Sequence, residues 1–196
     1  MKDIIAKTIG FKAVNTMIQF KLSAKQADNI TSGIHATATT LALFEYFYDP
    51  TNKKFNSIRS FSTAYFLYDI GQIMSYAKFN IMQLSYLYHH LASIYMLHAP
   101  LKHVIPVSEI LFLGELSNLP TYPLYHYLHT KTPNKNKITF LRLLQKFMYV
   151  GIRVPVMTQI LIQFLQKPYT PAKKFAYPIF PIWLMGMVWS FKIISQ

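Results

Sequence analysis

The chain contains no cysteine and few charged residues. The absence of cysteine from all 196 positions excludes disulfides and thiolate metal sites. Charged residues make up 14% of the sequence, whereas soluble domains carry about a quarter. Acidic residues are the scarcest, with seven Asp and Glu against twenty Lys and Arg, so the net charge is +13. This composition argues against an ordinary soluble domain.

Hydrophobic residues are abundant instead, at 52% of the chain. They lie in six blocks separated by short polar and basic stretches: 30–48, 59–77, 79–97, 104–128, 138–166 and 175–195. A 19-residue helix rises about 28 Å, close to the roughly 30 Å hydrocarbon core of a bilayer. We therefore expect an all-α membrane protein, a bundle of about six transmembrane helices. The alternative is a soluble all-α protein with thick core helices.

The first 24 residues form a separate basic segment, ahead of a transmembrane domain that covers residues 25–196. Lys7 and Lys12 interrupt its apolar residues, so it does not read as a signal peptide. Two interpretations remain open: a frayed basic tail, or a helix lying on the membrane surface. The apolar side of that helix would be formed by Ile4, Ile5, Phe11, Val14, Met17 and Ile18.

Basic residues gather in this segment and in the loops between the blocks. No nucleic-acid motif accompanies them, so we expect anionic lipid headgroups as their partners and no nucleic acid. The lysines of the first segment, together with Lys131, Lys135 and Lys137, narrowly outnumber the basic residues of the other loops. This asymmetry predicts that both termini of the multi-pass chain are cytoplasmic.

Three acidic residues fall near the centres of predicted spans: Asp69, Glu109 and Glu115. A carboxylate at such a position costs about 2.5–3.5 kcal/mol, so the fold must provide a partner, a proton or a wet cavity. Ionisable residues of this kind are candidates for a functional site.

His89 and His90 lie in the stretch SYLYHHLASIYML, which is otherwise apolar and aromatic. Adjacent residues point about 100° apart on a helix, so the two imidazoles face different directions. Tyr86 and Ser93 lie one turn before and after the pair, within hydrogen-bonding range of it. The sequence therefore predicts a polar facet on an apolar helix.

Two interpretations of this facet remain open. In one, it holds helices together, with His89 donating to Asp69 or Glu115 across an interface. In the other, a cavity reaches the histidines, which transfer protons or act as nucleophiles. His35, in the first block, is interpreted as a packing or hydrogen-bonding residue. His126 and His129 have i,i+3 spacing, but the seven histidines of the chain are too few for a di-iron histidine box, so no metal or other cofactor is expected.

The order of several short motifs resembles the TLC family, named for the TRAM, Lag1 and CLN8 proteins. The resemblance covers about residues 25 to 190. It rests on SGIHA, on FSTAYFLYDIG with its Tyr-Asp pair, on YHHLASIY with its paired histidines, on GELSNLP with its Glu-x-Ser stretch, and on Arg153 with Pro155.

This resemblance implies a helical bundle around a cavity that admits a lipid chain, in the endoplasmic reticulum or a related endomembrane. In the family's ceramide synthases, paired histidines serve acyl transfer from acyl-CoA to a long-chain base. Carried over, the catalytic residues would be His89 and His90, with Glu115 as an orienting carboxylate. The polar lining of the cavity would be formed by Asp69, Tyr86, Ser93, Asn118 and Arg153.

The ceramide synthases also carry an HD-x-SD cluster, where this chain has EILFLGELSNLP. In this respect the chain resembles the small non-synthase branch, whose members are associated with lipid composition or cargo sorting. We therefore expect a lipid-binding membrane protein that influences lipid composition or trafficking. The alternatives are an acyltransferase of the ceramide-synthase type and a proton-coupled lipid or solute carrier.

Overall fold

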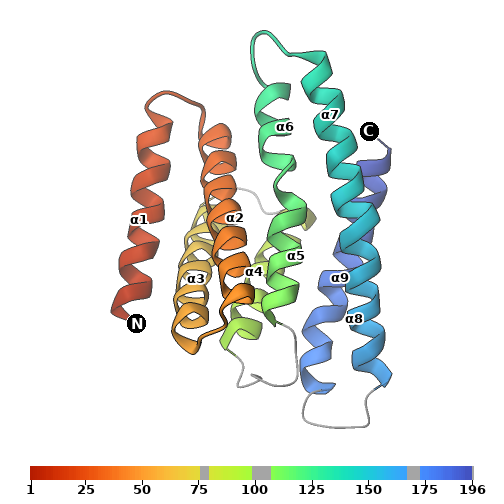
Figure 1. Cartoon of the computed structure of the whole chain (residues 1–196). Helices are drawn as coiled ribbons and strands as arrows, with labels where there is room; N and C mark the ends of the chain where they lie inside the picture. The colour runs from red at the N-terminus through yellow and green to blue at the C-terminus, as the bar shows by residue number, and fades with distance from the viewer. Residues whose placement is uncertain (76–79, 99–106, 167–172, 196) are drawn as a thin grey trace. The chain divides into compact units, whose positions relative to one another are not determined.

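A computed structural model describes residues 1–75, 80–98, 107–166 and 173–195, and all regular secondary structure of these residues is helical (Figure 1). The prediction of an all-α fold is confirmed. Among these residues, no helix combines the length and the apolar character that a membrane crossing requires. The chain divides between His98 and Ala99 into two compact units, each described here by itself.

Within residues 1–75 and 80–98, the first unit contains four long helices: α1 (Lys2–Gln19), α2 (Ala24–Tyr48), α3 (Asn52–Met74) and α4 (Ile81–His98). Ser23 begins α2 with a capping box, in which its hydroxyl and the Gln26 side chain satisfy each other's backbone amides. Thr51 caps α3 by accepting a hydrogen bond from the amide of Lys54. These caps start two helices several residues before the apolar blocks begin.

The first 24 residues do not form a frayed tail, because α1 is a regular helix that packs against α3 and α2. Phe11 of α1 is 7% exposed and lies 5.1 Å, ring centre to ring centre, from Phe61 of α3. The predicted domain boundary after residue 24 therefore does not coincide with the division of the chain into units.

The second unit contains α5 (Val107–Asn118), α6 (Thr121–Leu128), α7 (Lys135–Lys146), the π-helix η1 (Phe147–Arg153), α8 (Val154–Gln166) and α9 (Lys173–Ile194). The predicted fourth block is thus two helices. Pro120 separates them, because proline disfavours a helical conformation in the residue before it and cannot donate the next backbone hydrogen bond.

The predicted fifth block is one continuous helix whose middle turn is wound as a π-helix. Pro155 lies two residues after the end of this turn, and it lacks the N–H that an α-helix would use at that position. η1 packs against α5, while α8 packs against α9. The π-helical turn thereby directs its last residue, Arg153, to a buried position.

Candidate functional site

The helices α3 and α4 bring an imidazole and a carboxylate together. Nε2 of His90 lies 2.6 Å from Oδ2 of Asp69, a hydrogen-bonding distance for charged partners. The two side chains are 8% and 23% exposed, so the contact is largely shielded from solvent. The sequence analysis had considered a contact of His89 with Asp69 or Glu115, whereas the structure shows His90 in contact with Asp69. His90 lies on the side of α4 that faces α3, as do the buried Ser93 and Leu97 one and two turns later.

The ring of His90 packs among aromatic side chains of α3. Its centre lies 5.1 Å from that of Phe66, with the rings nearly parallel, and 6.3 Å from that of Tyr65, edge to face. Within the described part of the chain, Nδ1 of His90 is buried and has no hydrogen-bond partner. If Asp69 is ionised, Nε2 carries the proton and Nδ1 of the neutral ring has the free lone pair.

His89 is half-buried and lies beside His90, with 5.5 Å between the ring centres. The residues of the predicted polar facet lie partly on the buried side and partly on the exposed side of α4. Ser93 is 8% exposed on the buried side of α4, whereas Tyr86 is 38% exposed. Of the residues predicted for this facet, the structure therefore groups Ser93 with His90 on the side that faces α3.

A second imidazole lies deeper in the same unit. His35 of α2 is 1% exposed, and its ring lies parallel to that of Tyr65 at 3.9 Å between the centres. The hydroxyl of Tyr65 donates a 2.8 Å hydrogen bond to Ser32. The interpretation of His35 as a packing residue agrees with this position. Tyr65, which lies between the two histidines, was missed by the sequence analysis because an aromatic residue in an apolar block carries no distinguishing signal.

A polar network joins α1, α2 and α3 near one end of this unit. Asn15 is fully buried and donates to Asp28 at 2.9 Å and to Thr31 at 3.3 Å. Gln72 donates to the same carboxylate of Asp28 at 3.2 Å. The sequence analysis did not find this network, because its members lie on three helices and none belongs to a motif.

The second unit contains a separate cluster around Arg153. Its Nη1 donates to Asn118 at 3.2 Å and, more weakly, to Ser117 at 3.4 Å. Its guanidinium lies 4.6 Å from the centre of the Tyr149 ring, a cation–π contact. Glu115 is 8% exposed and interacts electrostatically with Arg153. The structure thus brings together three of the predicted residues, Glu115, Asn118 and Arg153.

The predicted catalytic trio is divided between the two units. His89 and His90 lie on α4, and Glu115 lies on α5. Each unit holds its own cluster: the histidine next to Asp69 in the first, and the glutamate next to Arg153 in the second. Among the described residues, no group of three or more His, Cys, Asp or Glu side chains is arranged to hold a metal ion.

Comparisons of the chain with protein-family models, with curated proteins and with solved structures find no match.

Proposed function

We propose that this chain is a multi-pass membrane protein of the TLC type, a bundle of about six transmembrane helices around a lipid-accessible cavity. In this proposal it binds a lipid chain and influences membrane lipid composition or trafficking, in the endoplasmic reticulum or a related endomembrane. The observation that carries the proposal is the distribution of polarity across the helices. Polar side chains are buried between helices, and large apolar side chains lie on the outside.

The most deeply buried side chains are unusually polar. Of the seven largest with less than 2% exposure among the described residues, five are polar: His35, Asn15, Thr31, Thr39 and Ser62. Several of them hydrogen-bond across helix pairs, as Thr39 does with Ser62 at 3.4 Å. Small and polar residues at helix contacts are typical of membrane bundles, where they allow close approach and interhelical hydrogen bonds.

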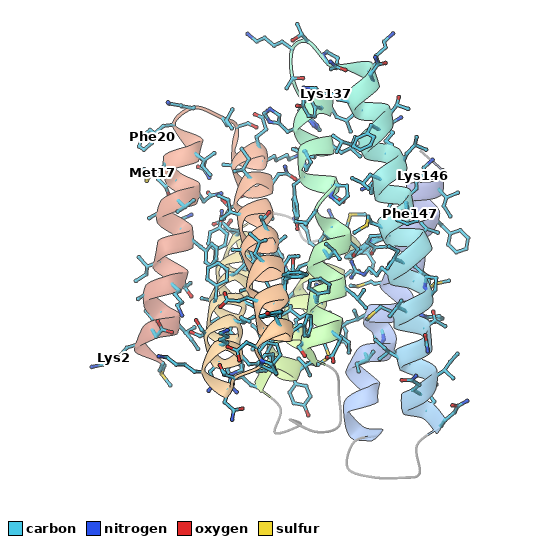
Figure 2. All side chains as sticks on the ribbon, viewed as in Figure 1. Lys2, Met17, Phe20, Lys137, Lys146 and Phe147 are labelled. Atoms are coloured by element: carbon cyan, nitrogen blue, oxygen red, sulfur yellow. The ribbon has the colours of Figure 1, made fainter. Side chains whose placement is uncertain are left out.

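The outward faces of the same helices are apolar. Leu41 and Phe44 of α2 are 66% and 68% exposed, and Phe191 of α9 is 70% exposed. Figure 2 shows Phe147, at the start of η1, on the outside of its helix. Soluble proteins rarely expose so many large apolar side chains together, and a hydrocarbon environment would cover them.

The charge distribution supports the same placement. All seven acidic residues lie at or before Glu115, while residues 116–196 carry ten Lys and Arg. Basic residues at the helix ends and in the loops suit anionic lipid headgroups. Membrane lipids are therefore the proposed partners.

The packing of His90 favours binding over chemistry. One of its ring nitrogens is occupied by Asp69, and the ring is enclosed by Phe66 and Tyr65. A histidine in this position holds α4 against α3. The imidazole of His90 and the carboxylate of Asp69 then form a polar spot between two largely apolar helices. We infer that such a facet orients a lipid headgroup or chain without reacting with it.

Photoaffinity labelling tests this proposal. The full chain is expressed in eukaryotic cells, and its membranes are incubated with photoactivatable analogues of a sphingoid base, a fatty acid and a phospholipid. We expect the chain to resist extraction at alkaline pH, and one analogue to crosslink to α4 and be displaced by its unlabelled parent. Release of the folded chain at alkaline pH would refute the membrane placement. Retention without displaceable crosslinking would refute the lipid site alone.

An acyltransferase of the ceramide-synthase type is the second candidate, and the contact between Asp69 and His90 favours it. A carboxylate that holds Nε2 leaves Nδ1 as a base. In this reaction the amine of a long-chain base attacks the thioester carbonyl of acyl-CoA. The C–N bond forms, the C–S bond breaks, and Nδ1 passes the amine proton to the departing thiolate.

N-acylation assays separate the two candidates. Membranes from cells without ceramide synthases receive labelled acyl-CoA and a long-chain base, and wild type is compared with His89→Ala and His90→Ala. Product from wild type that is lost in the His90 variant would establish acyl transfer. No product from inserted wild type, over several chain lengths, would exclude it and leave the lipid-binding function.

A further inference from the structure

We propose that α1 crosses the membrane beside α3 and that its outer face contacts the acyl chains of lipids. This inference rests on the proposed membrane placement and differs from the expectation of a helix lying on the membrane surface. Three observations carry it: the contacts on the inner face of α1, the residues on its outer face, and its direction relative to α3.

The inner face of α1 carries several polar groups beside the buried ring of Phe11. Lys7 donates to Asp3 at 2.8 Å, one turn earlier, and to Ser60 of α3 at 3.1 Å. Thr8 donates to the carbonyl oxygen of Ala64 at 3.2 Å. Further along, Asn15 is 0% exposed and donates to Asp28 of α2. On a surface helix Lys7, Thr8 and Asn15 would point to water, whereas here they are directed at neighbouring helices.

The outer face of α1 is apolar and unoccupied among the described residues. Ile5, Ile9, Met17 and Phe20 are 53%, 63%, 69% and 84% exposed, and Ala13 is exposed between them. At about 100° per residue these five positions lie within one side of the helix. In Figure 2, Met17 and Phe20 project from this side of α1, away from α2 and α3.

The axis of α1 follows that of α3. Lys7, Thr8 and Lys12 meet Ser60, Ala64 and Gln72 in the same order, so the two helices run parallel over these residues. Figure 1 shows α1 alongside α2 and α3 for most of its length. If α3 crosses the bilayer, a helix that follows it cannot lie flat on the surface.

The dimensions and ends of α1 fit a crossing. Its 18 residues rise about 27 Å, near the roughly 30 Å of the hydrocarbon core. Lys2 and Lys21 lie at the two ends, where long basic side chains reach the headgroups. Lys12 extends from the helix to Oε1 of Gln72 at 3.0 Å, so its ammonium has a polar partner. A crossing by α1 adds one span to the six expected ones and places the N-terminus opposite the C-terminus.

Acyl chains are the occupant that this face fits best. Among the positions between its ends, the hydroxyl of Thr16 donates to the carbonyl oxygen of Lys12 in its own helix. The exposed Lys12 lies at the edge of the face and donates to Gln72. An otherwise apolar face suits hydrocarbon, whereas protein interfaces combine an apolar centre with a polar rim.

Spin labelling of single cysteines tests this assignment, and the cysteine-free chain needs no prior substitution. The full chain is reconstituted in phospholipid vesicles with a nitroxide at Ile9→Cys or Ala13→Cys. Reference labels are placed at Phe44→Cys on α2 and Lys131→Cys in a basic loop. Relaxation by oxygen, which concentrates in hydrocarbon, is compared with relaxation by a water-soluble nickel chelate. Because the labelled positions are exposed, the substitutions leave the packing intact.

We expect positions 9 and 13 to resemble position 44, with oxygen at least severalfold more effective than the chelate, and position 131 to show the reverse. Chelate-dominated relaxation at 9 and 13 with an oxygen-dominated 44 would overturn the inference and leave the membrane placement intact. Low accessibility to both reagents at 9 and 13 would also overturn it, because another protein surface would then cover α1. Chelate-dominated relaxation at 44 as well would overturn the membrane placement itself.

Discussion

Asp69 of α3 and His90 of α4 are 21 positions apart in sequence, and Oδ2 of the first lies 2.6 Å from Nε2 of the second. It is shorter than a second polar link between the same helices, the 3.0 Å from Oγ1 of Thr63 to Nε2 of His98. The contact of Asp69 with His90 can hold the helices together whether or not the histidine takes part in a reaction.

Replacing Asp69 by alanine removes this link and leaves the buried ring of His90 without a partner at Nε2. A hydrogen bond to a charged group contributes about 1.5–3 kcal/mol, while polar contacts within membranes average about 0.6 kcal/mol. We therefore expect Asp69→Ala to lower the free energy of unfolding by about 1–3 kcal/mol. Reversible unfolding in mixed micelles measures it.

Asp49→Ala is the matched control, because its carboxylate is 62% exposed and the loss should be below about 1 kcal/mol. A double-mutant cycle with His90→Ala isolates the pair. Equal losses for Asp69→Ala and Asp49→Ala, together with no coupling to His90, would show that the contact does not stabilise the unit.

The stack of His35 on Tyr65 gives a second prediction. Tyr65→Phe keeps the ring, and thus the 3.9 Å stack, but removes the donor to Ser32. We expect a loss of about 1 kcal/mol, the same loss for Ser32→Ala, and little further loss in the double variant. Tyr48→Phe serves as the control because Tyr48 is 90% exposed. Fully additive effects of the two substitutions would contradict this account.

The helices could be predicted from the sequence more completely than the site. The apolar blocks correctly predicted where helices occur, because apolar runs of this length are typical of helices and are too long for strands. Helix ends were less accurate: α2 begins at Ala24 and not near residue 30, because the capping box at Ser23 determines the start and hydropathy does not report it. The sequence analysis expected one block over 104–128, although the conformational limits of Pro120 could have predicted the interruption. The π-helix η1 could not be predicted, because it depends on packing against α5.

The site could be predicted as a set of residues but not as a geometry. Acids and histidines in apolar blocks are recognisable because burying them is unfavourable, which is why Asp69 and His90 were identified. Arg153 was identified from the family resemblance. Which of two adjacent histidines faces α3 depends on the rotation of α4, and that rotation follows from tertiary packing. The network of Asn15 and Asp28 gave no signal, because short polar residues near helix ends are ordinary.

The connection between α2 and α3 gives a prediction about pH. Lys54 donates to Asp49 at 2.8 Å and also lies 3.1 Å from Glu45, and these contacts raise the pKa of its ammonium above the ordinary lysine value. The folded pKa is thus above the unfolded one, so the stabilising contribution is present at neutral pH. It is lost as the pH rises through the folded pKa, above about 10.4.

Carbon NMR of methylated lysines can follow this titration in micelles. We expect Asp49→Asn to move the pKa of Lys54 downward, toward the ordinary value, because the strongest of its contacts is then lost. Asp3→Asn, which alters an acid on α1, should leave the Lys54 titration unchanged. An unaltered titration in Asp49→Asn would show that Glu45 alone is sufficient.

In the second unit, Arg153 is 6% exposed and lies among Ser117, Asn118, Tyr149 and Glu115. Without Arg153, the side chains of Ser117 and Asn118 lose their donor and Glu115 loses a neighbouring positive charge. A buried polar group left unsatisfied costs about 1–3 kcal/mol. We therefore expect Arg153→Met to be among the most destabilising single substitutions in this unit.

Adding Glu115→Gln to Arg153→Met should restore a substantial part of the lost free energy of unfolding. Lys192→Met, at an exposed position in the last turn of α9, is the control and should change stability by less than about 0.5 kcal/mol. Arg153→Lys keeps the charge but not the planar group over Tyr149, so an intermediate loss is expected. If the double variant is no more stable than Arg153→Met, charge compensation is not the role of Arg153, and its contacts with Asn118 and Tyr149 account for the loss.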